Sequence, residues 1–220
     1  MSSSDLDWCE KHGVPGITGI DTRALTQKLR EEGVMLGRMI RGEVVSDQKS
    51  VVSEIEDPNL CNLVAEVSCT DVHSYEPSQS QIPDSGFRIP TIVAYDCGMK
   101  RNIMRSFLKR GVRVIRVPWD FDLSTADFEY DALFISNGPG DPKMCAPTIK
   151  SIQWALEKNI PTFGICLGNQ LLALAIGGDT YKLQYGHRGA NQPCIEEVES
   201  GRSEEHTSEL QSPCNLVCRL

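Results

Sequence analysis

A cysteine between two glycines is the residue of this sequence best placed to act as a nucleophile. Residues 164–172 read G-I-C-L-G-N-Q-L-L, which puts Cys166 in a tight turn between an expected strand and an expected helix. This is the thiol counterpart of the nucleophile elbow, whose glycines allow other backbone to pass close by. The N-terminal end of the following helix favours a thiolate, and the Leu167 N–H would face a developing oxyanion. The alternative is a structural cysteine buried in a glycine-rich turn.

A second loop suited to a small substrate covers residues 136–142, which read S-N-G-P-G-D-P. Its two glycines and two prolines predict a stiff turn whose backbone a ligand can approach closely. The amides of this loop would either donate to the same oxyanion or bind the polar end of a substrate. The loop lacks the G-x-x-x-x-G-K-[ST] pattern of a phosphate-binding loop. An ordinary turn between a strand and a helix is the alternative.

The elements that must position these loops alternate between short apolar strands and amphipathic helices. Strands are expected at residues 91–95, 112–117, 132–136 and 161–165, and helices at 102–109, 146–158 and 167–176. This alternation predicts an α/β fold, with a parallel sheet covered by helices on both faces. The carboxyl ends of parallel strands meet at one edge of such a sheet, so the two loops should lie together there.

The chain before this sheet contains one clear helix. Asp21 is its expected N-cap, and Gly33 stands at the C′ position after its last turn. Residues 34–40 are expected to form a strand. Residues 68–88 are polar, contain prolines and show little periodicity, which is typical of a linker.

Composition and charge exclude several classes of function. The chain has 220 residues, 40% of them hydrophobic, and a formal net charge of −8. Because a nucleic-acid-binding protein needs a concentrated basic face, we expect no nucleic-acid partner. No apolar run is long enough for a membrane span, and no export signal is visible at the N-terminus. The nine cysteines form no C-x-x-C pair, which favours reduced thiols in an intracellular compartment.

The two loops together resemble those of class I glutamine amidotransferases. More narrowly, the chain resembles the small subunit, or glutaminase, of carbamoyl-phosphate synthetase. This narrower resemblance rests on G-I-D-T-R at 19–23, A-Y-D-C-G-M-K at 94–100 and V-P-W at 117–119. T-Y-K at 180–182, R-G at 188–189 and N-Q-P at 191–193 continue it beyond the elbow helix. The family implies a flavodoxin-like parallel sheet with flanking helices, here truncated and preceded by the end of the small-subunit N-terminal domain.

The resemblance divides the chain into segments. Residues 1–70 would be the C-terminal part of the small-subunit N-terminal domain, 71–90 a linker, and 91–202 the N-terminal portion of the amidotransferase domain. Residues 203–220 resemble the in-frame translation of a sequencing adapter, and we expect them to be an artefactual tail. His206, Cys214 and Cys218 in this tail are too weak a pattern for a zinc site, so no metal ligand is assigned.

The resemblance implies a glutaminase reaction. In the family, the elbow cysteine attacks the carboxamide carbon of glutamine, ammonia leaves, and the resulting thioester is hydrolysed to glutamate. Carried over to this sequence, Cys166 is the catalytic nucleophile, and Gly138, Gly140, Leu167 and Gln170 contact the glutamine and the oxyanion. Position 169 is asparagine, where the family commonly has histidine, and we expect a modest effect of this difference.

The resemblance also implies a partner. The ammonia would pass to a synthetase, as a separate large subunit or a fused domain, which makes carbamoyl phosphate for pyrimidine or for arginine and urea synthesis. We expect no cofactor in this chain, since ATP and magnesium are used by the synthetase unit. A cytoplasmic location is expected, with the mitochondrial matrix as the alternative.

A thiol nucleophile also needs a base. The family takes it from a downstream His-Pro-Glu element, with further substrate contacts from a Gln-Asn-His-Gly element, and neither is present here. None of the histidines, at positions 12, 73, 187 and 206, stands in such an element. We therefore expect a fragment with little or no activity alone. The alternatives are a non-catalytic pseudo-glutaminase or regulatory docking module, and a flavodoxin-like nucleotide binder.

Overall fold

The computed structural model describes residues 3–37, 57–78, 88–182, 194–197 and 203–206. The chain divides into two compact units, Met1–Val52 and Ser53–Leu220. We describe each unit by itself. None of the helices in the described ranges is long and apolar enough to cross a membrane.

The first unit contains the helices α1 (Ser3–Lys11) and α2 (Thr22–Glu32). The predicted caps of α2 are confirmed. Asp21 Oδ1 accepts a hydrogen bond from the Ala24 N–H at 2.9 Å, and Gly33 adopts a φ of 84° after the last turn. Helix α2 contains no buried residue.

The strand predicted at residues 34–40 is wrong over 34–37, which form no strand. Residues 38–40 lie outside the described residues. A strand needs a partner for its backbone groups, and the described part of the first unit contains no other strand for residues 34–37 to pair with.

The second unit begins with short elements that precede its main sheet. These are the turn η1 (Pro58–Leu60), the helix α4 (Leu63–Val67) and the strand β1 (His73–Tyr75). Val64 of α4 is 1% exposed and belongs to the core, and β1 pairs with a strand of the sheet. Residues 63–75 are therefore part of the same compact unit as the sheet, although the sequence pattern places them in the preceding domain and the linker.

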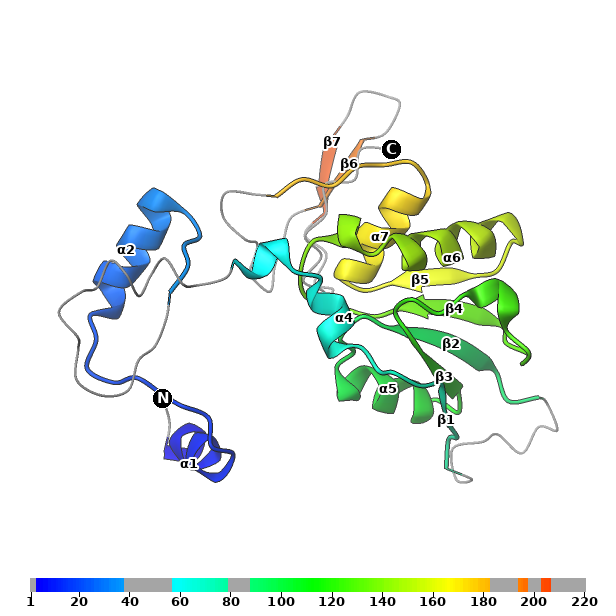
Figure 1. Cartoon of the computed structure of the whole chain (residues 1–220), viewed down its shortest axis with the longest axis horizontal. Helices are drawn as coiled ribbons and strands as arrows, with labels where there is room; N and C mark the ends of the chain where they lie inside the picture. Colours follow the sequence, from blue (N-terminus) through cyan, green and yellow to red (C-terminus); the bar gives the residue numbers. More distant parts are fainter. Residues whose placement is uncertain (1–2, 38–56, 79–87, 183–193, 198–202, 207–220) are drawn as a thin grey trace. The chain divides into compact units, whose positions relative to one another are not determined.

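The main sheet has five strands in the order β1-β3-β2-β4-β5 (Figure 1). Four of them are the predicted strands, at nearly the predicted residues: β2 (Thr91–Asp96), β3 (Arg113–Pro118), β4 (Ala132–Ile135) and β5 (Thr162–Gly164). They pair in parallel, as predicted for an α/β fold. The sheet is nevertheless mixed, because β1 joins its edge antiparallel to β3.

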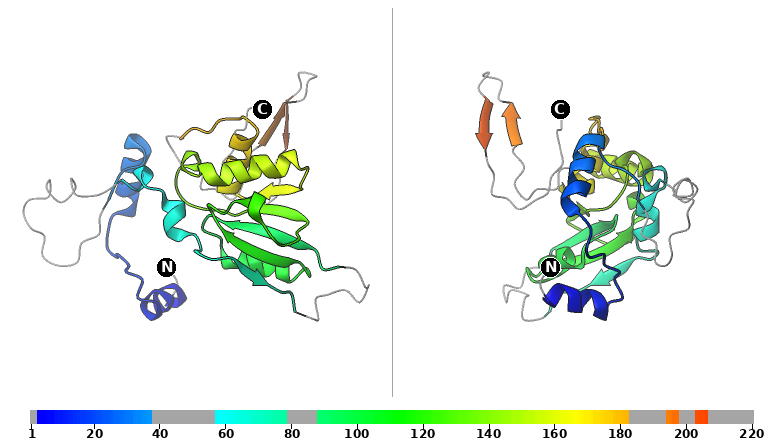
Figure 2. Two further views of the ribbon diagram at one scale, coloured as in Figure 1. Left: turned by 45° about the vertical axis from the view of Figure 1, so that its right-hand side comes forward. Right: turned by 90° about the vertical axis from the view of Figure 1, so that its left-hand side faces the viewer.

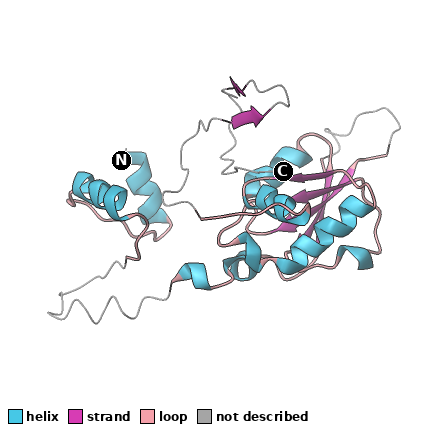
Figure 3. Cartoon of the chain, turned by 90° about the horizontal axis from the view of Figure 1, so that it is seen from above, coloured by secondary structure: helices cyan, strands magenta, loops and turns pink. Residues whose placement is uncertain are grey.

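Helices cover both faces of this sheet, as predicted. They are α5 (Arg101–Leu108), α6 (Ala146–Glu157) and α7 (Leu167–Ala175). Figure 1 shows α6 and α7 on one face and α5 on the other, and the views in Figures 2 and 3 show the same layers. Two short turns, η3 (Leu123–Thr125) and η4 (Pro142–Met144), lie in the connections.

Alternate residues of the strands supply the two halves of the core. Val93, Tyr95 and Ile135 pack with Ile152 of α6 and Leu171 of α7. The intervening residues Ile92, Ala94, Val114 and Phe134 form a second cluster, against which Ile103 and Phe107 of α5 pack. All six residues of β2 are buried. A strand buried on both faces accounts for the continuous apolar run in the sequence.

A separate two-stranded antiparallel sheet joins β6 (Cys194–Glu197) and β7 (Ser203–His206). Strand β7 lies within the segment 203–220 that the sequence pattern assigns to a tail. Residues 207–220, which include Cys214 and Cys218, lie outside the described residues, as do His187 and the motif residues 188–189 and 191–193.

Candidate active site

The predicted loops lie at the same edge of the sheet. Strands β4 and β5 are parallel neighbours, and their last residues, Ile135 and Gly164, are paired across the sheet. The loop 136–141 and the turn at Cys166 follow directly from these two ends. The turn 97–99 after β2 lies beside them, because β2 is the other neighbour of β4. The structure thus gathers three loops at the carboxyl ends of adjacent parallel strands.

Cys166 has the backbone conformation of a nucleophile elbow. Its φ is 53° and its ψ is −109°, a left-handed conformation that a side-chain-bearing residue rarely adopts. The turn is held from both sides. Ile165 N–H donates to Ile135 O of β4 at 3.0 Å, and the Asn169 and Gln170 N–H groups donate to Cys166 O at 3.1 and 3.2 Å. These bonds hold the strained backbone of Cys166 in place between the end of β5 and the start of α7.

The glycines that flank Cys166 are required by close backbone contacts, as predicted. A Cβ atom added at Gly164 would lie 2.6 Å from the Asn169 nitrogen. One added at Gly168 would lie 2.8 Å from the carbonyl carbon of Ile135. Real Cβ atoms do not approach other atoms this closely, so only glycine allows α7 to begin against the ends of β4 and β5.

The structure also brings Gly138 to the elbow. A Cβ atom at Gly138 would lie 2.8 Å from Leu167 Cδ2 and 2.9 Å from the carbonyl carbon of Cys97. Gly138 is therefore held between the start of α7 and the turn after β2. Gly140 has a φ of 84°, and a Cβ atom there would lie 3.5 Å from the Cβ of Leu63 in α4.

The backbone N–H groups of Leu167 and Gly138 donate no hydrogen bond to any residue that the structure describes. Leu167 is the first residue of α7, where a helix leaves its N–H groups without intrahelical acceptors. Donors of this kind next to a nucleophile are suited to an oxyanion that develops during the reaction. Gln170 lies one turn into α7, is partly buried and takes part in other polar contacts.

Other thiols in the described part of the chain differ from Cys166. Cys97 and Cys145 are fully buried. Burial raises the pKa of the Cys145 thiol to about 11 and raises the pKa of Cys97 further. Burial also raises the pKa of Cys69, and the Asp96 carboxylate adds to the effect. A thiol whose pKa is raised is a poor nucleophile near neutral pH, whereas Cys166 is partly exposed at the elbow.

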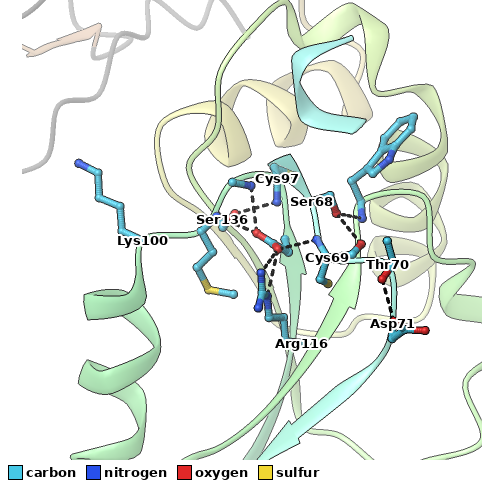
Figure 4. A network of polar contacts seen from close by, with 12 residues as sticks. Ser68, Cys69, Thr70, Asp71, Cys97, Lys100, Arg116 and Ser136 are labelled. Carbon is cyan, nitrogen blue, oxygen red and sulfur yellow. Dashed lines mark hydrogen bonds and ion pairs between the residues drawn. The ribbon is translucent and has the colours of Figure 1, made fainter. Parts of the chain in front are cut away.

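A buried carboxylate next to the site has no role in the sequence analysis. Asp96, the last residue of β2, is 0% exposed. Its Oδ1 accepts hydrogen bonds from the Gly98 and Met99 N–H groups at 3.0 and 2.7 Å. Its Oδ2 accepts from the Cys69 N–H at 2.8 Å and from the Arg116 guanidinium, whose Nε lies at 3.0 Å and whose Nη2 forms an ion pair with it (Figure 4).

These contacts keep Asp96 charged. Burial by itself raises the pKa of a carboxyl, but the hydrogen bonds from Met99 and Arg116 outweigh it, so the pKa of Asp96 lies below its usual value. The only signal in the sequence was an acidic residue at the end of an apolar strand, followed by a glycine two positions later. Its partners Cys69 and Arg116 are distant in sequence, and local pattern does not reveal them.

Of the histidines whose side chains the structure describes, His73 is the one in the same unit as the elbow. His12 belongs to the first unit. His73 lies in β1, at the opposite edge of the sheet from β5. Four strand spacings of about 4.8 Å separate these edges, on the order of 19 Å. His73 is therefore not placed to act as a base for Cys166.

A cavity of about 520 Å³ lies at the other end of the strands. Thr91 and Arg113, the first residues of β2 and β3, line it together with Arg88 and Glu129. Arg88 forms ion pairs with Glu129 and Asp131 at its rim. Because parallel strands run away from this end toward the elbow, the cavity is separate from the candidate active site.

The fold and the elbow together define a class of protein. The sequence profile of the glutamine amidotransferase class-I family matches residues 93–213, more than half of the chain. The chain therefore belongs to the class I glutamine amidotransferase family. The match runs past residue 202, where the sequence resemblance was expected to end.

Further matches are to small chains of carbamoyl-phosphate synthase, the type that the sequence analysis predicted, and to a multifunctional protein. The profile of the carbamoyl-phosphate synthase small chain, CPSase domain, matches residues 1–39. The chain is 42% identical over 201 residues to the carbamoyl phosphate synthase small chain of Pyrococcus furiosus, covering 90% of this chain and 51% of that protein. It is 48% identical over 190 residues to multifunctional protein CAD of Squalus acanthias, covering 86% of this chain and 8% of that protein.

The chain thus spans about half the length of the small chain that it matches, and a small part of the multifunctional protein. Among solved structures, a glutamine amidotransferase from Thermotoga maritima matches with a TM-score of 0.39 and 19% identity, covering 53% of this chain and 55% of that chain.

Proposed function

We propose that this chain carries the nucleophile of a glutaminase that hydrolyses glutamine to glutamate and ammonia for carbamoyl phosphate synthesis. The observation that carries the proposal is the strained elbow at Cys166, with the unpaired N–H groups of Leu167 and Gly138 beside it in the described structure. The name of the similar small chain of Pyrococcus furiosus, a carbamoyl phosphate synthase, supports the choice of carbamoyl phosphate synthesis.

The reaction assigns one role to each group at the elbow. The Cys166 thiolate attacks the carboxamide carbon of glutamine, a C–S bond forms, and the carbonyl electron pair moves to oxygen. The N–H groups of Leu167 and Gly138 stabilise this oxyanion. The C–N bond then breaks, the nitrogen takes a proton and leaves as ammonia. Water attacks the thioester, the C–S bond breaks, and glutamate is released.

Two further residues complete the proposed glutamine site. Gln170 lies one turn along α7 from Cys166 and is partly buried. Gly140 belongs to the same stiff loop as Gly138. We assign both to contacts with the polar end of glutamine, because their elements begin at the same sheet edge as the elbow.

Turnover needs an acid–base group that takes the proton of the thiol, gives it to the leaving nitrogen, and then takes a proton from the attacking water. His73, in β1, lies at the far edge of the sheet from β5, and the downstream His-Pro-Glu element of the family is not present in the sequence. We therefore propose that the chain alone forms a covalent adduct at Cys166 but releases little ammonia.

The proposed partner is a synthetase unit, separate or fused, that consumes the ammonia. We place the use of ATP and magnesium in that unit and none in this chain. The six described cysteines are free thiols, which fits a reducing compartment. The cytoplasm is the proposed location, and the mitochondrial matrix is the alternative.

The proposal is tested by alkylation of Cys166 with the chloroketone analogue of glutamine. The ketone oxygen accepts hydrogen bonds from the Leu167 and Gly138 N–H groups while the thiolate sulfur displaces chloride, so a C–S bond forms as the C–Cl bond breaks. The adduct is located by peptide mass spectrometry. We expect modification at Cys166 that free glutamine slows. Cys166→Ser should abolish it, whereas the matched variant Cys61→Ser, at another partly exposed thiol, should leave it unchanged.

Two outcomes would contradict parts of the proposal. If the folded chain is not modified at Cys166, or if glutamine does not slow the modification, the glutaminase assignment is wrong. A non-catalytic docking module is then favoured. If the chain steadily releases ammonia from glutamine and Cys166→Ser does not, the expectation of low turnover is wrong.

A further inference from the structure

The turn after β2 connects the buried carboxylate of Asp96 to the proposed oxyanion site. Gly98 and Met99 donate their N–H groups to Asp96 Oδ1, so the carboxylate fixes the path of this turn. Gly98 has a φ of 115°, and a Cβ atom there would lie 3.2 Å from Pro139 Cδ. The turn therefore packs directly against the loop that contains Gly138.

Hydrogen bonds join the same turn and loop. Cys97 N–H donates to Ser136 Oγ at 2.9 Å, and Asn137 Nδ2 donates to Gly98 O at 3.1 Å (Figure 4 shows Cys97 and Ser136). A displacement of the turn would therefore move the loop with it.

Gly138 is closely packed by its neighbours on two sides. The carbonyl of Cys97 lies against one side of its Cα, and the Leu167 side chain lies against another. The Gly138 backbone thus takes its position from Cys97, while the Leu167 N–H takes its position from α7. The separation of these two donors depends on where the turn after β2 is held.

An asparagine cannot hold the turn in the same way. Asp96 accepts from three backbone N–H groups and from two guanidinium nitrogens of Arg116. An amide has one acceptor oxygen, and its NH₂ group would face donors on the other side. Either the turn or the contact with Cys69 and Arg116 would lose its acceptor.

We propose that Asp96 is a positioning residue for the glutaminase reaction: through the turn at 97–99, it sets the separation of the Gly138 and Leu167 N–H groups. This inference rests on the proposed function. Asp96 touches neither glutamine nor Cys166, and acts through Cys97, Gly98 and the loop that they support.

The experiment compares the rates at which the chloroketone analogue of glutamine alkylates Cys166 in four variants. Asp96→Asn leaves a single acceptor oxygen for the turn and for the contact with Cys69 and Arg116. Arg116→Gln removes the ion pair but leaves Asp96 Oδ1 with its two N–H donors. Ser136→Ala removes the hydroxyl oxygen that accepts from the Cys97 N–H and so breaks the link between the turn and the loop. Asp127→Asn changes an exposed carboxylate and is the control. Circular dichroism establishes that each variant is folded at the temperature used.

We expect Asp96→Asn to lower the maximal first-order rate about tenfold or more, because a misplaced oxyanion donor costs at least this much. The analogue concentration at half-maximal rate should change less than about threefold, since ground-state contacts remain. Ser136→Ala should lower the maximal rate in the same direction. Arg116→Gln and Asp127→Asn should keep it within about twofold of the unsubstituted chain.

Equal maximal rates for Asp96→Asn and the unsubstituted chain overturn the inference, while the glutaminase proposal stands. An equal decrease in Arg116→Gln and Asp96→Asn also overturns it, because loss of the ion pair alone would then suffice. Failure of the unsubstituted chain to react is instead a failure of the proposed function.

Amide resonances of the uniformly ¹⁵N-labelled chain test the positioning without any reaction. Asp96→Asn should shift the Gly138 and Leu167 resonances, and Asp127→Asn should leave both in place. Unchanged resonances of Gly138 and Leu167 in folded Asp96→Asn would overturn the inference by themselves.

Discussion

Backbone conformation distinguishes Cys166 from the other described cysteines at the scale of single residues. Cys97 and Cys145 are buried thiols whose pKa values are raised by desolvation. Cys166 is partly exposed and is held at a positive φ by hydrogen bonds to β4 and from α7. Strain of this kind costs about 1–3 kcal/mol and persists only where the surroundings enforce it. The surrounding glycines and strand ends therefore maintain a geometry useful for nucleophilic attack.

Asp96 makes a residue-scale prediction about pH and stability. Its pKa is lower in the folded chain than its usual value, so its contribution is present above about pH 4 and is lost as the pH falls through the folded value. Urea unfolding at a series of pH values should therefore show the free energy of unfolding decreasing in acid. Asp96→Asn should show a smaller decrease over the same range, and Asp127→Asn should follow the unsubstituted chain. The same acid dependence in Asp96→Asn would contradict this account.

At the scale of elements, close packing against the sheet determines where α7 begins. The helix begins directly after Cys166, and Gly168 in its first turn lies against Ile135 at the end of β4. Helix propensity alone disfavours glycine here by about 1 kcal/mol relative to alanine. The contact with β4 outweighs propensity, because any side chain at 168 would push α7 away from the strand that positions the elbow.

Gly168→Ala should therefore destabilise the chain although it raises helix propensity. A Cβ atom there would lie 2.9 Å from Ile135 Cβ and closer to the Ile135 carbonyl. We expect the free energy of unfolding in urea to fall by about 1–3 kcal/mol. Glu157→Ala, at an exposed position of α6, should change it by less than about 0.5 kcal/mol. A gain in stability for Gly168→Ala would show that α7 is free to move from β4.

At the scale of the whole molecule, the two compact units differ in how many of their residues are buried. Strand β2 is buried at all six residues and has neighbours on both sides. Helix α2 buries none, and Leu25 and Leu29 on it remain 45% and 38% exposed. Local opening is governed by the buried contacts that it must break. The sheet should therefore be the most stable part of the described chain.

Hydrogen exchange followed by mass spectrometry should report this difference directly. We expect peptides that cover β2 to exchange at least about a hundredfold more slowly than peptides that cover α2, since each 1.4 kcal/mol of opening free energy is a factor of about ten. Peptides from the β4 strand serve as an internal reference for the sheet. Equal protection of α2 and β2 would contradict the assignment of stability to the sheet.

Local sequence was sufficient for the parallel strands, their helices and the elbow. Apolar runs and helical periodicity depend on neighbouring residues, so β2 to β5 and α5 to α7 were found within a few residues of their bounds. The glycines around Cys166 were informative for the same reason, because a tight turn has a local requirement. Residues 34–37 were misassigned, since an apolar run forms a strand only beside a partner.

The sequence by itself determined the family of this protein, its α/β class and the candidate nucleophile. Only the tertiary structure decided that β1 closes the sheet as an antiparallel edge, that Gly138 lies between Cys97 and Leu167, and that Asp96 joins Cys69 to Arg116. These contacts join residues that are far apart in the sequence, such as Cys97 and Gly138, which are 41 positions apart. Strand order and register create such contacts, and no local pattern of side chains encodes which distant backbone will come within reach.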